Sequence, residues 1–263
     1  MIRRKQFRRA VDCCTASGDD NKADVNLPPR RWGPLPPSPR VWEKAPDSLQ
    51  WLEARVFKLI GRLVLFFGRW TAVPGMPHEH KQLVVIANPH TSNWDLVWML
   101  AVAWSTGIEL RWMGKESLFR GLAGPFMRLL GGMAIDRSQT NNVVDASAAE
   151  FTKHERLWLV VPAAGTRSKR DYWKSGFYWI ARSAGVPIAC GYLDYARRTG
   201  GIHKLVTPTD DLSADMDEIR AFYAPIAGKF PEKVTRIRLR AEDEEQEAST
   251  TERAATPEPA PSA

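Results

Sequence analysis

Strand-like and helix-like segments alternate from residue 82 to residue 239, and this alternation constrains the fold more than any other feature of the chain. Apolar runs predict strands at 82–88, 109–113, 132–136, 156–162, 187–193, 203–208 and 234–239. Helical patterns predict helices near 93–105, 117–130, 141–153, 174–184 and 214–228. Such alternation builds a largely parallel sheet flanked by helices. The sequence therefore predicts an α/β fold.

A basic amphipathic segment, residues 48–73, precedes the first predicted strand. On a helix of about 100° per residue, four cations form one stripe: Arg55, Lys58, Arg62 and Arg69. A wide apolar arc lies beside the stripe, made of Leu52, Val56, Leu59, Ile60, Leu63, Phe66, Phe67 and Trp70. This pattern is typical of a helix that lies on an anionic membrane surface. The alternative is a helix packed on the domain with a solvated charged edge.

The two ends of the chain differ from its middle in composition. Residues 1–47 are basic and rich in proline, whereas residues 241–263 are acidic and contain no large apolar residue. Neither segment can bury enough apolar surface to offset the entropy lost on ordering, so we expect both to be disordered. One domain, residues 48–240, lies between them. Whether the first residues are a transit segment or an over-extended start stays open.

The predicted domain is strongly basic. The whole chain carries +7, residues 1–48 carry +4 and residues 241–263 carry −6, which leaves +9 on residues 49–240. Such a charge favours an anionic partner, and we expect a membrane surface or phosphorylated lipid. The charge is spread along the domain without a nucleic-acid-binding signature, so we expect no nucleic-acid partner. Three cysteines without a disulfide pattern indicate a reducing compartment.

The motif "NPHTSNWD" follows the first predicted strand and contains His90 and Asp95. In open α/β sheets, sites form at the ends of strands. On one continuous helix the two side chains would point about 140° apart. They can meet if His90 lies in the loop and Asp95 in the first helical turn, with Ser92 as the N-cap of a capping box. Asp95 would then orient His90 as a general base for a hydroxyl group.

Three further motifs follow in order, and together with the first they give a family resemblance. They are "GKESLFRGLAGPFMRLLGGMAIDR" from Gly114, "AAGTRS" around Gly165, and Val186-Pro187-Ile188. The chain resembles the 1-acyl-sn-glycerol-3-phosphate acyltransferase family, within the glycerolipid acyltransferase superfamily, from about residue 82 to residue 190.

The resemblance implies an activity and a set of site residues. His90, oriented by Asp95, would deprotonate the free hydroxyl of a lysophospholipid, which attacks the thioester of acyl-CoA or acyl-carrier protein. Substrate-binding residues would be Lys115, Arg137, Gly165, Thr166 and Arg167, because cations and close backbone amides suit a phosphate. We expect no metal and no cofactor beyond the acyl thioester. The product would be phosphatidic acid, made by a membrane-associated protein on the cytoplasmic face.

One motif departs from the family pattern. The family has Pro-Glu-Gly-Thr-Arg where this chain has Ala163 and Ala164 before Gly165. A methyl group cannot form the hydrogen bonds of the missing glutamate. The identity of the acceptor therefore stays open, with another lyso-lipid, such as a lyso-aminolipid, as one alternative. A lipid-binding homologue that has lost turnover is another.

Overall fold

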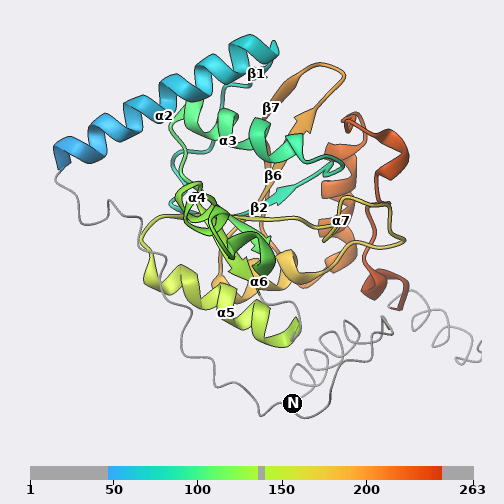
Figure 1. Ribbon diagram of the computed structural model, residues 1–263. Helices are drawn as coiled ribbons and strands as arrows, with labels where there is room; N and C mark the ends of the chain where they lie inside the picture. The colour runs from blue at the N-terminus through green and yellow to red at the C-terminus, as the bar shows by residue number, and fades with distance from the viewer. Residues whose placement is uncertain (1–46, 136–139, 245–263) are drawn as a thin grey trace, which may run out of the picture.

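The computed structural model describes residues 47–135 and 140–244, and the strands of these residues form one sheet (Figure 1). The strand order is β1-β7-β6-β2-β5-β3-β4. The strands are β1 (Thr71–Ala72), β2 (Gln82–Ala87), β3 (Leu110–Lys115), β4 (Gly132–Ile135), β5 (Leu157–Val161), β6 (Ile188–Asp194) and β7 (Thr199–Val206). Every strand pair is parallel except β6 with β7. The predicted α/β fold with a largely parallel sheet is confirmed.

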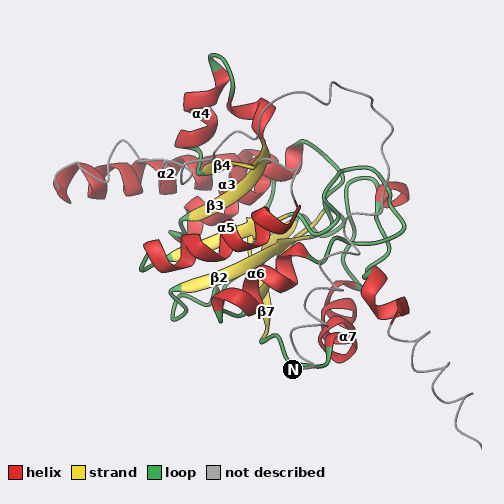
Figure 2. Ribbon diagram, turned by 90° about the horizontal axis from the view of Figure 1, so that it is seen from below, coloured by secondary structure: helices red, strands yellow, loops and turns green. Residues whose placement is uncertain are grey.

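Helices cover both faces of the sheet (Figures 1 and 2). One face carries α2 (Asp47–Gly68), α3 (Trp94–Thr106) and α4 (Ala123–Leu129). The other face carries α5 (Thr140–Lys153), α6 (Gly176–Ala184) and α7 (Leu212–Tyr223). Two short 3-10 helices, η2 (Glu116–Phe119) and η3 (Pro231–Lys233), lie in the connections.

The two hydrophobic cores follow from the alternation of side chains along each strand. In β2, Leu83 and Val85 pack under α3, whereas Val84 and Ile86 pack on the opposite side with α6 and α7. All four side chains are almost completely buried. A central parallel strand is covered on both faces, which is why its sequence is continuously apolar rather than alternating.

Two predicted elements are wrong, each for a local reason. The helix expected near 117–130 is divided into η2 and α4, because Gly121 between them has a φ of +64°. This left-handed conformation favours glycine and ends a right-handed helix. The strand expected at 234–239 does not join the sheet. Its only bridge in the described part of the chain pairs Leu239 with Trp173 of a loop.

The N-terminal helix is present, but it is shorter than residues 48–73, because α2 ends at Gly68. Trp70 is buried and stacks on Trp98 of α3, with ring centroids 5.0 Å apart, so it does not belong to the exposed arc. The other side of α2 packs on α3 through Gly61 and Leu65, which are buried. The remaining described residues of the apolar arc are exposed: Val56, Leu59, Ile60, Leu63, Phe66 and Phe67.

None of the helices in the described residues is both long enough and apolar enough to cross a bilayer. Most of the two predicted tails lies outside the described residues. Residues 241–244 are described, and the side chain of Glu242 is fully buried.

Candidate active site

Three neighbouring strands bring the predicted site residues to one edge of the sheet. In the sheet, β5 lies between β2 and β3, and all three run parallel. The loop that contains His90 follows β2, the loop that contains Arg167 follows β5, and Lys115 is the last residue of β3. Carboxyl ends of parallel strands face the same edge, so residues from three distant parts of the sequence surround one site.

His90 and Asp95 form the pair that the motif predicts. His90 lies in the loop and Asp95 in the first turn of α3, and His90 Nδ1 is 3.2 Å from Asp95 Oδ2. A carboxylate can only accept hydrogen bonds, so the proton of neutral His90 is on Nδ1. Nε2 is then left unprotonated, as a general base requires.

Asp95 is held as a carboxylate by four donors. Its Oδ2 also accepts hydrogen bonds from the backbone N–H groups of Thr91 (2.8 Å) and Ser92 (2.9 Å). Its Oδ1 accepts one from the Tyr195 hydroxyl at 2.6 Å. Burial alone would raise the pKa of Asp95, but the hydrogen bonds from His90, Tyr195 and Ser92 hold that pKa below its ordinary value.

The sequence motifs do not indicate a role for Tyr195, because it lies 100 positions after Asp95 and belongs to none of them. Burial and the hydrogen bond to Asp95 raise the pKa of the Tyr195 hydroxyl. The hydroxyl therefore stays protonated and donates a hydrogen bond to the carboxylate.

The capping box is only partly formed. The N-cap of α3 is Asn93 rather than Ser92, and its side chain makes no capping hydrogen bond. The Ser92 hydroxyl instead accepts a hydrogen bond from Trp94 N at 3.2 Å. Of the two hydrogen bonds of a capping box, only the one from Ser92 N to the Asp95 carboxylate is formed. The same carboxylate points back toward the loop and reaches His90.

His90 and Asp95 line a cavity of about 460 Å³ that extends between the sheet and α3. Its inner wall is apolar and is formed by residues such as Val85, Met99, Val102, Trp112, Val160 and Ile202. Lys115, Gly165, Thr166 and Arg167 also line it. The structure thus brings together every predicted site residue except Arg137, which lies outside the described residues. A volume of this size suits an organic ligand.

The turn after β5 has a structural requirement for glycine. Gly165 has a φ of +67°, and its N–H donates to Pro162 O at 2.9 Å. A side chain at this position would be strained and would press against Lys174. The turn places Thr166 and the exposed Arg167 at the cavity.

Ala163 and Ala164 face the hydrophobic core rather than the cavity. Their exposed fractions are 1% and 8%, and they pack with residues of α6 and α7. Neither lines the cavity, although Pro162 and Gly165 on either side do. The two alanines that differ from the family motif are therefore not among the residues that line the cavity.

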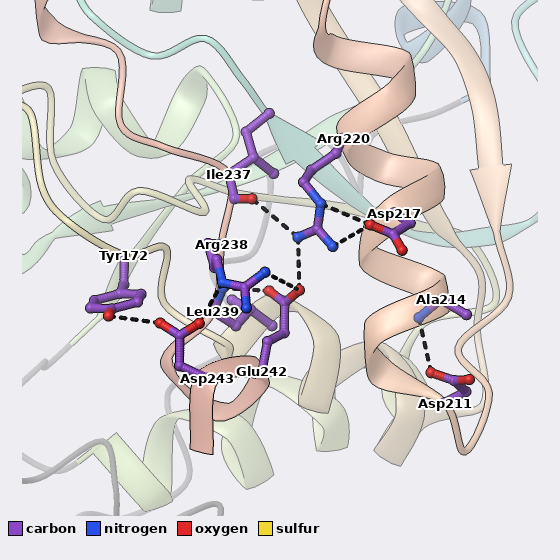
Figure 3. Close-up of polar contacts among 10 residues, drawn as sticks. All are labelled: Tyr172, Asp211, Ala214, Asp217, Arg220, Ile237, Arg238, Leu239, Glu242 and Asp243. Atoms are coloured by element: carbon purple, nitrogen blue, oxygen red, sulfur yellow. Dashed lines mark hydrogen bonds and ion pairs between the residues drawn. The ribbon is translucent and has the colours of Figure 1, made fainter. Parts of the chain in front are cut away.

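The C-terminal segment holds the loop that carries Arg167. Trp173 N donates to Arg238 O at 2.8 Å, and Arg170 N donates to Thr235 Oγ1 at 3.0 Å. Tyr172 donates to Asp243 at 2.8 Å (Figure 3).

That segment is in turn fixed to α7 by the buried carboxylate of Glu242. It accepts hydrogen bonds from Leu239 N at 2.6 Å and from Arg220 at 2.7 Å (Figure 3). Arg220 also donates to Ile237 O at 3.2 Å. The last described residues of the chain thus support the loop that carries Arg167.

Cys190 does not supply a nucleophile. The side chain is fully buried in β6, and burial raises the pKa of its thiol to about 12. At neutral pH the group is therefore a thiol, which reacts far more slowly than a thiolate.

Fold and site together define an α/β protein with a histidine–aspartate pair and two nearby cations on an apolar cavity. The model of the family described as Acyltransferase matches residues 73–192, a range that includes His90, Asp95, Lys115 and Arg167. Over this range the chain is similar to the acyltransferase family.

Among solved structures, the chain is similar to the 1-acyl-sn-glycerophosphate (LPA) acyltransferase PlsC from Thermotoga maritima. The identity is 18% over 65% of this chain and 75% of that chain, with a TM-score of 0.46. Among curated protein sequences, none matches this chain.

Proposed function

We propose that this acyltransferase moves a fatty acyl group from acyl-CoA or acyl-carrier protein to 1-acyl-sn-glycerol 3-phosphate, which gives phosphatidic acid. One observation carries the proposal: the His90–Asp95 pair and the cations Lys115 and Arg167 line the same apolar cavity. A substrate with a hydroxyl, a phosphate and a hydrocarbon chain would use all three features.

The reaction needs no covalent enzyme intermediate. His90 Nε2 takes the proton of the acceptor hydroxyl as its oxygen attacks the thioester carbonyl. The new C–O ester bond forms, the C–S bond breaks, and the leaving thiolate recovers the proton from His90. Asp95, held by Thr91 and Ser92, stabilises the positive charge on His90 in between. A thioester is already activated, which agrees with a thiol at Cys190 that is not ionised.

The polar and apolar parts of the cavity suit the two parts of the substrate. Lys115 and Arg167 are exposed cations that can form charge-assisted hydrogen bonds with a phosphate. The apolar wall between the sheet and α3 suits a hydrocarbon chain, because burying apolar surface there removes it from water. Arg137 stays a predicted phosphate ligand.

The test is product formation by the purified full-length protein. It is given an acyl thioester and a panel of lysophospholipids with different headgroups, and both thiol release and product lipid mass are measured. The expected result is phosphatidic acid formed faster than any other product, with His90→Ala as the matched inactive control. Faster acylation of a lyso-aminolipid would mean that this lipid, and not 1-acyl-sn-glycerol 3-phosphate, is the acceptor. Lipid binding without thiol release would favour the non-catalytic alternative.

We also propose that α2 lies on an anionic membrane surface. The supporting observation is that its apolar arc stays exposed, with Phe66 and Phe67 at 75% and 79%. Three cations border the arc, namely Arg55, Lys58 and Arg62. Each cation near an anionic surface contributes about 1 kcal/mol. The cytoplasmic face stays a prediction.

Reversing these three cations of α2 to Glu tests the attachment. The variant should be released from anionic vesicles, whereas reversal of Lys153, Arg156 and Arg236, which are exposed elsewhere, should have little effect. Equal binding of the wild type to neutral and anionic vesicles would contradict the electrostatic part of the proposal.

A further inference from the structure

A second hollow, separate from the cavity at His90, opens where the end of α2 meets the start of α3. Its volume is about 370 Å³, and it is lined by the rings of Trp70, Trp94, Trp98 and Tyr195, by Gly68, and by the cations Arg198 and Lys229. None of these residues lines the larger cavity.

The aromatic side chains that line the hollow pack against one another. Trp70 and Trp98 stack with ring centroids 5.0 Å apart, and Trp94 also stacks on Trp98, with ring centroids 6.1 Å apart. The Tyr195 ring meets Trp70 edge-on at 4.9 Å. Gly68 permits this packing, because a methyl group there would overlap the Trp98 ring.

The two cations give the hollow a positive charge. Lys229 Nζ lies 5.6 Å from the centre of the Trp94 ring and 5.7 Å from that of Phe230. Neither Lys229 nor Arg198 forms an ion pair with any residue that the structure describes. Both are exposed. An anion that entered the hollow could therefore pair with them without displacing a carboxylate.

The hollow adjoins an exposed apolar surface. Phe66 and Phe67 immediately precede Gly68 and are 75% and 79% exposed. A ligand that combines an anionic group with hydrocarbon would use both surfaces, whereas a small soluble anion would leave the two phenylalanines uncovered. Amphipathic tryptophan rings beside cations are typical of the depth at which lipid headgroups lie.

We propose that this hollow binds the phosphate headgroup of a bilayer phospholipid, with Arg198 and Lys229 on the phosphate and Phe66 and Phe67 against the adjoining hydrocarbon. It would be a lipid site distinct from the acceptor site. The proposal does not depend on the proposed acyl transfer, because binding is measured without thioester and without turnover. The two proposals can therefore fail separately.

The first test is the double variant Arg198→Gln, Lys229→Gln, bound to vesicles of phosphatidylcholine alone or mixed with phosphatidylglycerol. Affinity for the mixed vesicles should fall about fivefold for each cation, and about thirtyfold for both. The matched control, Arg156→Gln with Arg236→Gln, removes the same charge at exposed positions elsewhere and should lose little. A loss no larger than that of the control would overturn the proposal.

A second variant changes the shape of the hollow but not its charge. Gly68→Ala should displace Trp98 and reduce the preference for phosphatidylglycerol vesicles severalfold, while binding to neutral vesicles is retained. An unchanged preference would mean that the hollow is not the binding site. Inorganic phosphate and monomeric short-chain phosphatidylglycerol are then compared by tryptophan fluorescence. The lipid should bind more tightly, and equal affinity for free phosphate would overturn the assignment to lipid.

Discussion

The hydroxyl of Tyr195 donates a 2.6 Å hydrogen bond to Asp95, and Asp95 in turn lies 3.2 Å from His90. The tyrosine comes from the connection between β6 and β7, just beyond the last residue of the family match. Both oxygens of the buried Asp95 carboxylate accept hydrogen bonds, so the carboxylate is held in one orientation. This orientation in turn fixes the orientation of the His90 imidazole. We therefore propose that Tyr195 is a positioning residue for the proposed general base, His90.

Tyr195→Phe keeps the ring and its packing against Trp70 but removes the hydroxyl. We expect kcat to fall with the acceptor KM unchanged, because the orientation of His90 changes but the cavity does not. The pKa of Asp95 should rise toward its ordinary value, since one of the hydrogen bonds that lower it is lost. Kinetics and NMR titration of the carboxyl group measure the two effects. Tyr178→Phe, which removes a hydroxyl that donates to the buried Asp215 of α7, is the control, and an equal loss of kcat there would contradict the role.

His90→Ala should remove nearly all turnover while folding and vesicle binding are retained. A general base contributes at least about a hundredfold. Single-turnover rates with a saturating thioester isolate the chemical step, and circular dichroism checks the fold. Activity above about a tenth of the wild-type rate would rule out the general-base role.

Asp95→Asn should change the pH dependence of stability. In the wild type the folded-state pKa of Asp95 lies below its unfolded value, so the carboxylate stabilises the fold above about pH 4. This contribution is lost as the pH falls through the folded pKa. The difference in unfolding free energy between wild type and variant should therefore be large at pH 7 and shrink below about pH 4. Denaturant titrations at several pH values measure it, and a constant difference would argue against the lowered pKa.

Ala164→Glu tests the departure from the family motif. If position 164 contacted the acceptor, the glutamate would lower the acceptor KM. The structure instead predicts loss of stability, by several kcal/mol, because a carboxylate would be placed in the hydrophobic core. Thermal and denaturant unfolding measure this, with Ala149→Glu on the exposed side of α5 as the control. A stable variant with a lower KM would restore the interpretation based on the family pattern.

Glu242→Ala should destabilise the domain by about 3 kcal/mol, because Arg220 would lose its buried partner. The loop anchored by Arg238 should loosen, so the acceptor KM should rise more than kcat falls. Glu155→Ala, which breaks an exposed ion pair with Lys81, is the control and should change stability little. A stability loss without any change in KM would mean that the C-terminal segment does not influence substrate binding by the loop that carries Arg167.

The sequence alone was sufficient for features that depend on short stretches of chain. The continuous apolar run of β2 and the pairing of His90 with Asp95 are both encoded within about ten residues. Their spacing determines which side chains share a face and which can meet. The order of the motifs was also sufficient to bring Lys115 and Arg167 to the same edge as His90, because parallel strands place their carboxyl ends together.

Only the tertiary structure decided the contacts between distant segments. Tyr195 reaches Asp95, Glu242 pairs with Arg220, and Ala164 turns into the core rather than toward the cavity. The residues expected to form a last strand instead support a loop through Trp173. Local periodicity reports the polarity of each face of an element, but not which neighbour will cover it. The partner of a buried polar group is set by the packing of whole layers, and that information is distributed over the entire chain.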